Sequence, residues 1–339
     1  MSVFKSLSSK IFALMALAMM LLPSPANAEP TRLDDTEIGT KLNLPVYKWQ
    51  DKSVQQKGII FAIHGATLYA RRFEAAARHF ASEGYTFYAV DLRGFGRWRT
   101  EGERFQGGDR KIHYTESEDD ILAVLQQIRA RNPQEKIYCM GESLGANLGV
   151  WVGSTHPDLV SGLILVSPCI RSTFHPSFRS YWFAFRGFLD PDEKQNLAAN
   201  IRPFLCDDQS ATDEYLNDPG INHVLSAKEL VKSLKTNTIA IESKEKIPAS
   251  MPVLIVAGEK DQIYKASAIP PFADEMGSKH KTIDIIPKRG HLLVEYDRVT
   301  PEVLGLIDKW LDSNDSKQPN DIATDSSPNR KTVESAAAN

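Results

Sequence analysis

Cysteine is scarce in this chain, which has three among its 339 residues: Cys139, Cys169 and Cys206. An odd number leaves at least one thiol unpaired within the chain, and the spacings do not indicate a zinc site. Cys139 lies inside an apolar run, so we expect it to be a small buried side chain. A disulfide between Cys169 and Cys206 stays open as an alternative for an exported protein.

The chain also lacks a long basic block. Its 40 Lys and Arg residues nearly balance 43 Asp and Glu residues, and the formal net charge is −3, so nucleic acid is not an expected partner. No phosphate-binding loop is present, and the Gly-x-Gly at 94–96 lacks the third glycine of a dinucleotide fingerprint. The sequence therefore implies no metal and no organic cofactor.

No apolar run is long enough to span a bilayer, which takes roughly 20 residues. The apolar run at 11–22 follows two lysines, ends at two prolines and leads to Ala-Asn-Ala at 26–28. This pattern predicts a signal peptide over residues 1–28, cleaved after Ala28. We therefore expect export, with a mature chain that begins at Glu29 in the periplasm or outside the cell. An uncleaved anchor or a core helix is the alternative.

Short apolar runs recur along the chain with helical patterns between them. They cover residues 59–63, 85–90, 136–140, 162–166, 253–257 and 282–286. Such runs are typical of parallel strands that are buried on both faces. Between the second and third runs, one apolar helix face is marked by Ile121, Leu122, Val124, Leu125 and Ile128. The alternation predicts an α/β fold with a mostly parallel sheet and helices on both faces, preceded by an antiparallel edge strand at 46–49.

The alternation of strand and helix breaks between Ile170 and Ser250. We interpret residues 171–250 as an insertion over the sheet, within a single domain of residues 29–312. From Ser313 the chain is polar and aperiodic, so residues 313–339 are predicted to be a disordered tail. A partner-binding segment is the alternative for the tail.

Residues 141–145 read Gly-Glu-Ser-Leu-Gly and match G-x-S-x-G between a predicted strand and a helical run. This context is what the nucleophile elbow requires. The turn would lift Ser143 clear of the sheet, and the new helix would direct its first N–H groups at developing negative charge. We therefore predict that Ser143 is a nucleophile; a plain turn serine is the alternative.

A serine nucleophile needs a base, and His291 follows the last predicted strand directly after Gly290. The other candidates lie before Ser143, in the insertion or before that strand: His64, His113, His175, His223 and His280. We therefore predict His291 as the base, with a surface-loop histidine as the alternative.

Asp261 lies just past the run at 253–257 and is the predicted acid that orients His291. Its rival is Glu259, and an exposed loop acid is the plain alternative. The order serine, aspartate, histidine is the order of elbow-type triads. After the first central strand comes His-Gly-Ala at 64–66, and the N–H groups of Ala66 and Leu144 are predicted to form an oxyanion hole. His64 itself is predicted to be structural.

These motifs resemble those of α/β-hydrolases, in particular the group of monoglyceride lipases, lysophospholipases and serine-aminopeptidase-like enzymes. The resemblance runs from about Gly58 to Leu311 and rests on residues 64–66, 91–96, 141–145, Asp261 and 290–291. We expect the 91–96 segment to be a tight loop near the mouth of the site.

The resemblance implies an eight-stranded, mostly parallel sheet with a lid between the sixth and seventh strands. It also implies that Ser143, Asp261 and His291 form the catalytic triad, with Ala66 and Leu144 as the oxyanion donors. Glu142 departs from the pattern, because the lipases commonly have His at that position.

We therefore expect a serine hydrolase that cleaves carboxylic esters through an acyl-enzyme, in the manner of an esterase or lysophospholipase. A serine peptidase or amidase that acts on short peptides is one alternative, and a catalytically silent binding protein of the same fold is another. The expected partner is a small-molecule ester, acyl or lipid-like, and any membrane contact would be made through the lid.

Seven aromatic residues lie between positions 174 and 188. Phe178, Trp182 and Phe185 are spaced so that one helical face would carry all three. Such a face above Ser143 would suit an acyl chain of medium length. Two alternatives stay open: the rings attach the insertion to the sheet, or the nearby Arg179 and Arg186 receive an acidic head group.

Overall fold

The computed structural model describes residues 29–105, 107–173, 178–197, 209–295, 297 and 299–315. The predicted signal peptide lies outside these ranges, as do Phe174, His175 and Cys206. Within them, no helix combines the length and the apolar character needed to cross a membrane.

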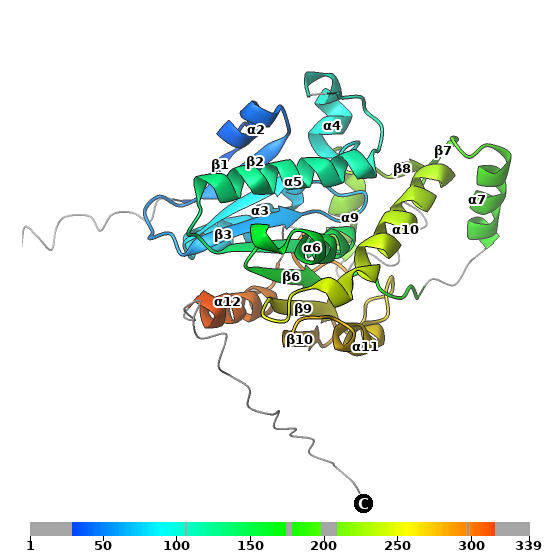
Figure 1. The fold of residues 1–339 in the computed structure, drawn as a ribbon. Helices are drawn as coiled ribbons and strands as arrows, with labels where there is room; N and C mark the ends of the chain where they lie inside the picture. Colours follow the sequence, from blue (N-terminus) through cyan, green and yellow to red (C-terminus); the bar gives the residue numbers. More distant parts are fainter. Residues whose placement is uncertain are drawn as a thin grey trace, which may run out of the picture.

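An eight-stranded sheet runs through the centre of the molecule, in the order β1-β2-β4-β3-β5-β6-β9-β10 (Figure 1). The strands are β1 (Thr31–Leu33), β2 (Val46–Gln50), β3 (Gly58–Ile63), β4 (Tyr85–Val90), β5 (Ile137–Glu142), β6 (Gly162–Val166), β9 (Pro252–Gly258) and β10 (His280–Ile286). From β4 to β10 all neighbours are parallel, whereas β2 is antiparallel to both β1 and β4. The predicted parallel strands are confirmed.

The antiparallel strand at 46–49 is also confirmed, but its place in the sheet was predicted wrongly. The edge is formed by β1, in which Thr31, Arg32 and Leu33 pair with β2. A strand of three residues is too short for an alternating pattern to appear in the sequence.

Helices cover both faces of the sheet, and the side chains of β3 show how the two cores divide. Ile59, Phe61 and Ile63 pack in one core with α5 (Tyr114–Arg131) and α6 (Leu144–Thr155). Ile60 and Ala62 pack in the other, with α3 (Glu74–Ser82) and α12 (Pro301–Asp315). This is the alternation expected of a strand buried on both faces. The predicted helix face lies in α5, where Ile121, Val124, Leu125 and Ile128 are buried.

The remaining short elements lie around this framework. They are α2 (Glu37–Leu42), η1 (Ala70–Phe73), α4 (Gly96–Glu101), η2 (Gly102–Arg104), η3 (Pro157–Leu159), η6 (Ala266–Ala268) and α11 (Ile269–Asp274).

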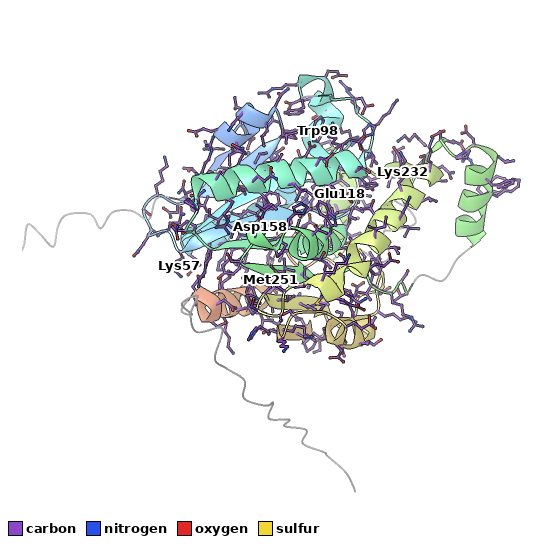
Figure 2. The ribbon with its side chains drawn as sticks, viewed as in Figure 1. Lys57, Trp98, Glu118, Asp158, Lys232 and Met251 are labelled. Carbon is purple, nitrogen blue, oxygen red and sulfur yellow. The ribbon has the colours of Figure 1, made fainter. Side chains whose placement is uncertain are left out.

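The segment at 91–96 is a tight loop, as predicted, and it is held by its own buried carboxylate. Asp91 accepts hydrogen bonds from the Tyr47 hydroxyl and from the backbone N–H groups of Ala70 and Arg97. The indole N–H of Trp98, labelled in Figure 2, donates to the Asp91 carbonyl at 2.9 Å. None of residues 91–96 lines the cavity described below, so the loop supports the fold and does not form the mouth of the site.

The boundary of the predicted tail needs correction, because α12 continues to Asp315. Ser313 and Asn314 both donate to the Trp310 carbonyl. The Asp315 carboxylate accepts hydrogen bonds from the hydroxyls of Tyr85 and Tyr138, at the start of two central strands. These polar contacts hold the last turn of α12 against the domain. The apolar periodicity of the sequence therefore does not reveal it.

Residues 171–250, which we call the insertion, connect β6 to β9. Its described elements are α7 (Phe178–Leu189), β7 (Lys194–Asn196), α9 (Gln209–Asn217), β8 (Val224–Ser226), α10 (Ala227–Glu242) and η5 (Lys244–Lys246). A capping box between Ser226 and Glu229 begins α10.

In Figure 1, α7 lies on the side of α10 that faces away from the sheet. Gly187 permits their contact, because a Cβ atom there would lie 2.4 Å from the Cβ of Ala227.

Candidate active site

Ser143 lies in a strained turn between β5 and α6. Its backbone has φ 57° and ψ −118°, a conformation that a non-glycine residue adopts at a cost of about 1–3 kcal/mol. Flanking glycines are required: a Cβ at Gly145 would lie 1.8 Å from the Ile63 carbonyl oxygen, and one at Gly141 would lie 2.2 Å from the Gly145 carbonyl. The Ser143 N–H donates to the Val166 carbonyl at 2.9 Å, which ties the turn to β6.

The structure pairs His291 with Asp261. His291 Nδ1 lies 2.7 Å from Asp261 Oδ2, and the two side chains are only 5% and 3% exposed. The other oxygen of Asp261 accepts the N–H groups of Ile263 and Tyr264 at 2.7 and 2.9 Å, so the carboxylate is fixed in orientation. The rival acid Glu259 is exposed, and its carboxylate accepts the Lys288 N–H instead.

The electrostatics of His291 favour its charged form. Burial alone would lower the pKa of His291, but the charge and hydrogen bond of Asp261, with a further contribution from Glu142, outweigh it and raise the pKa above 6.5. Because Nδ1 is engaged by Asp261, Nε2 is the ring nitrogen left to accept a proton.

The predicted oxyanion donors lie at the start of α6 and after β3. Leu144 is the first residue of α6, where backbone N–H groups have no partner within the helix. Ala66 lines the cavity that also contains Ser143. Within the part of the chain that the structure describes, neither amide donates to a backbone carbonyl. Both amides therefore retain a donor for a bound oxyanion.

The structural interpretation of His64 agrees with its contacts. Its ring is fully buried, Nδ1 lies 2.8 Å from the Gly65 carbonyl oxygen, and Nε2 accepts the Leu92 N–H at 3.0 Å. Burial lowers the pKa of His64 to about 4, so the ring is neutral at neutral pH. His113, His223 and His280 do not line the cavity, and His175 lies outside the described residues.

Ser143 and His291 share a cavity of about 330 Å³ whose walls are mostly apolar. Its described lining residues are Ala66, Thr67, Leu68, Ser143, Cys169, Leu197, Tyr215, Leu225, Leu230, Ser233, Leu234, Asn237, Ile263, Tyr264, His291 and Leu292. No Asp, Glu, Lys or Arg occurs among them. The roof comes from the insertion, through β8, α9, α10 and Leu197, the residue directly after β7.

The described members of the predicted aromatic face of α7, Trp182 and Phe185, do not line this cavity. Trp182 and Phe185 are 55% and 50% exposed, and none of the described side chains of α7 is among the lining residues. The side chain of Phe178 lies outside the described set. The helix is present, but α10 lies between it and the site (Figure 1), and leucines supply the apolar wall instead.

Cys169 is a neighbour of the nucleophile that the sequence did not single out for this role. Its Sγ lies 3.3 Å from the Ser143 Oγ. The thiol of Cys169 is free, and Cys206, its partner in the alternative of a disulfide, lies outside the described residues. Burial raises the pKa of Cys169 to about 12, which keeps the thiol protonated and poorly reactive.

Asn147 connects the insertion to the elbow, a role that no local sequence pattern indicated. From α6 it accepts the N–H of Cys169 at 3.0 Å and donates to the Cys169 carbonyl at 3.1 Å. The same amide donates to the side-chain oxygen of Asn237 on α10 at 3.0 Å. One buried side chain therefore fixes the roof of the cavity relative to the nucleophile.

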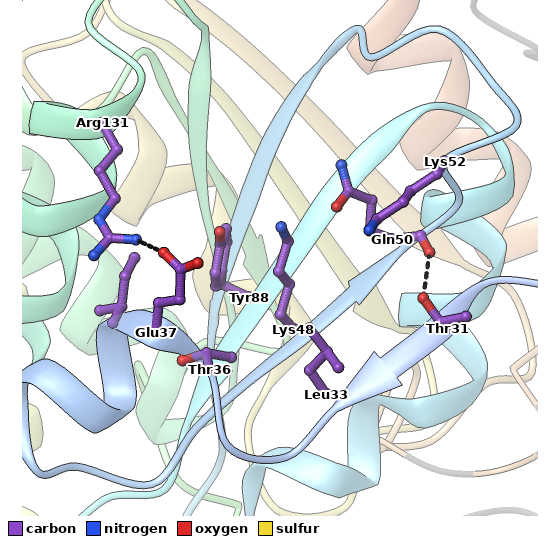
Figure 3. Close-up of a pocket in the computed structure, with 10 residues that line it drawn as sticks. Thr31, Leu33, Thr36, Glu37, Lys48, Gln50, Lys52, Tyr88 and Arg131 are labelled. Atoms are coloured by element: carbon purple, nitrogen blue, oxygen red, sulfur yellow. Dashed lines mark hydrogen bonds and ion pairs between the residues drawn. The ribbon is translucent and has the colours of Figure 1, made fainter.

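A second cavity, of about 280 Å³, lies at the sheet edge formed by β1 and β2 (Figure 3). Lys48, Lys52 and Arg131 line it, and Arg131 forms an ion pair with Glu37 at 2.6 Å. None of the predicted site residues lines this cavity. Among the residues that the structure describes, no cluster of three His, Cys, Asp or Glu side chains is arranged to bind a metal ion.

Comparison with known proteins places the chain among hydrolases. The family described as "Serine aminopeptidase, S33" matches residues 54–297. The monoglyceride lipase of Rattus norvegicus is 24% identical over 258 residues, which cover 75% of this chain and 82% of that protein.

Solved structures share the fold. A monoacylglycerol lipase from Paleococcus ferrophilus superposes with a TM-score of 0.63 at 22% identity, covering 85% of this chain and all of that one. A soluble variant of the monoglyceride lipase from Saccharomyces cerevisiae, in complex with a substrate analog, superposes with a TM-score of 0.65 at 18% identity. The match covers 86% of this chain and 99% of that one.

Proposed function

The chain belongs to the serine aminopeptidase S33 family of α/β-hydrolases, and from that premise we propose that it hydrolyses carboxylic esters through an acyl-enzyme on Ser143. The observation that carries the proposal is the paired and buried His291 and Asp261 in the cavity that contains Ser143. Relatives named as monoglyceride lipases support ester hydrolysis.

The mechanism follows from the roles that each group can play. Ser143 Oγ forms a bond to the acyl carbon while His291 Nε2 takes its proton, and the N–H groups of Ala66 and Leu144 stabilise the oxyanion. The carbon–oxygen bond to the alcohol then breaks, and His291 returns the proton to the leaving alkoxide. Water attacks the acyl-enzyme by the same route and releases the acid.

The lining of the cavity favours esters over aminoacyl substrates. An aminopeptidase must bind a protonated amino group, and a carboxylate is the usual partner for such a charge. Among the described lining residues there is neither Asp nor Glu. An apolar acyl group, by contrast, gains about 0.8 kcal/mol for each buried CH₂ group. We therefore propose a medium-length acyl ester, such as a monoacylglycerol, as the substrate.

The outer face of the insertion supports contact with a lipid surface. Large apolar side chains that do not line the cavity are exposed on α7 and α10: Trp182, Phe185, Phe188, Leu189, Val231 and Ile239. Exposed apolar surface on this scale is typical of interaction sites. We propose that this face meets the aggregated lipid that delivers the substrate.

We also propose that the enzyme acts outside the cytoplasm. The basic, apolar and small-residue pattern over residues 1–28 supports this location. N-terminal sequencing of the protein recovered from its native host should begin at Glu29. Recovery of the intact chain from cytosol alone would contradict the proposal.

A substrate panel tests the main proposal. Purified protein is assayed on p-nitrophenyl esters from acetate to laurate, on a monoacylglycerol and on aminoacyl p-nitroanilides, with Ser143→Ala as the blank. We expect kcat/KM to rise with acyl length before it levels off, and no cleavage of the anilides. Acetate as the best ester, or cleavage of aminoacyl anilides alone, would contradict the proposal.

A further inference from the structure

Two fully buried carboxylates lie beside the site and are not used by the proposed mechanism. Glu142 and Glu295 are both 0% exposed. Neither forms an ion pair with a Lys or Arg in the described part of the chain, although Arg72 is near enough to Glu295 to act on it through its charge. Burying a carboxylate is costly unless hydrogen bonds compensate. The hydrogen bonds that offset the cost of burying these two carboxylates therefore indicate what the side chains do.

Among the described residues, the donors to the Glu142 carboxylate are all backbone N–H groups of the loop that carries His291. Its carboxylate accepts the N–H groups of Leu293, Val294 and Glu295, the last at 2.8 Å. In the sequence, Glu142 directly precedes Ser143. A single side chain therefore joins the turn that presents the nucleophile to the loop that presents the base.

Glu295 continues the connection to the third loop of the site. Its two oxygens lie 3.0 and 2.8 Å from the Gly65 nitrogen, which donates to them. Gly65 directly precedes Ala66, the predicted oxyanion donor. A Cβ atom at Gly65 would lie 2.9 Å from Glu295 Oε2 and 3.3 Å from the Glu142 carbonyl oxygen, so the loop can approach this closely only with glycine.

We propose that Glu142 and Glu295 are positioning residues that fix the loops of Ser143, His291 and Ala66 relative to one another, through hydrogen bonds to the backbone. This proposal rests on the proposed function, because it assigns the two side chains to the same reaction. Neither carboxyl group touches the reacting atoms. Their effect is to hold the base and the oxyanion donor at the distances that catalysis requires.

The two groups differ in the charge that their partners demand. Glu142 accepts three N–H groups, which its ionised form satisfies best, whereas Gly65 is the one donor to the Glu295 carboxylate among the described residues. Burial raises the pKa of Glu142 to about 7 and that of Glu295 well above 4.5, and repulsion from Glu142 adds to the latter. The charged or titratable groups that face them are His291 for Glu142, and Arg72 and Tyr215 for Glu295. Repulsion from Glu142 therefore favours the protonated form of Glu295.

Conservative substitutions separate positioning from a general structural role. In Glu142→Gln, one amide oxygen must replace two carboxylate oxygens, and an NH₂ group faces a backbone N–H. We expect kcat to fall about 10- to 100-fold while KM stays within about twofold. The acid limb of the kcat/KM profile should also move to lower pH, because the anion that raises the pKa of His291 is gone.

Glu295 offers a matched pair of variants. Glu295→Gln keeps an oxygen that can accept the Gly65 N–H, so kcat should stay within about threefold of the wild-type value. Glu295→Leu leaves that N–H without an acceptor and should lower kcat about tenfold. The exposed Glu83 at the end of α3 provides the control, Glu83→Gln, which should change neither quantity.

Each protein is checked for folding by circular dichroism and then assayed by p-nitrophenyl ester turnover and by the rate of fluorophosphonate labelling. A folded Glu142→Gln protein with the kcat and acid limb of the wild type would overturn the proposal. So would equal activity of Glu295→Leu and Glu295→Gln, which decides the matter if Glu142→Gln does not fold. Wild-type protein that labels but does not cleave esters would contradict the proposed function alone, and the labelling rates would still test the pair.

Discussion

The floor and the roof of the cavity are built on different principles. The floor consists of loops at the carboxyl ends of buried strands, in which Ser143, Asp261 and His291 are held by strained backbone and paired hydrogen bonds. The roof is the insertion, whose contribution to the cavity is mainly leucine side chains such as Leu225 and Leu230. The chemistry is therefore fixed by geometry, whereas the selectivity depends on apolar volume that tolerates exchange.

The largest difference in kcat is expected between variants of two neighbouring residues on the floor, Ser143 and Cys169. Ser143→Ala should lower kcat by about 10³-fold or more, because it removes the proposed nucleophile. Cys169→Ala, which removes the neighbour 3.3 Å from the Ser143 Oγ, should leave kcat within about threefold. Steady-state ester kinetics on folded variants would check both. A greater loss of kcat in Cys169→Ala than in Ser143→Ala would contradict the assignment of Ser143 as the nucleophile.

A smaller but still large effect should separate the two acids of the β9 loop. Asp261→Asn should lower kcat about 10²- to 10³-fold, because an amide cannot hold His291 in the required tautomer. Glu259→Gln should stay within about twofold, since that carboxylate is exposed. Comparable losses in both variants would contradict the assignment of the acid.

The raised pKa of His291 predicts a pH dependence of kcat/KM, an effect of intermediate size. His291 must be neutral to accept a proton, and its pKa is raised above 6.5, so kcat/KM should fall below a midpoint that lies above pH 6.5. Each further pH unit should cost about tenfold in kcat/KM. In Asp261→Asn the residual activity should have its midpoint at lower pH. A flat wild-type profile from about pH 5 to 8 would exclude a histidine base.

The smallest effects belong to the roof. Leu230→Ala should flatten the rise of kcat/KM with acyl length, each lost CH₂ contact being worth about fourfold. Trp182→Ala should leave soluble esters unaffected, because Trp182 is 55% exposed and outside the cavity, but should slow hydrolysis of monoacylglycerol presented in vesicles. Measurements of kcat/KM against acyl length on both variants test this. A weaker dependence on acyl length in Trp182→Ala would show that α7 contacts the acyl chain.

Features with a local sequence pattern could be predicted, whereas features that depend on contacts between distant residues could not. The central strands and the elbow could be inferred because a buried run and a G-x-S-x-G turn are local patterns. The short edge strand β1 and the last turn of α12 have no such signal, since pairing and tyrosine hydroxyls hold them. The sequence left open whether the aromatic face of α7 lines the cavity, because periodicity reveals a face but not what it contacts.

The role of Glu295 was missed for a related reason. Glu142 and the backbone of Glu295 lie 153 positions apart in the chain, and Gly65 and the Glu295 carboxylate lie 230 apart. Only the parallel sheet brings their loops together. No local pattern contains that information, although the acid next to the serine marked one end of the connection.

All the proposed roles in catalysis depend on the formation of an acyl-enzyme at Ser143. The most direct measurement is peptide mapping by mass spectrometry after the protein is quenched in acid during turnover of a p-nitrophenyl ester. We expect an acyl group on the peptide that contains residues 141–145, located at Ser143 and absent from Ser143→Ala. An adduct on Cys169, or turnover with no adduct on Ser143 despite a burst of p-nitrophenol, would contradict it.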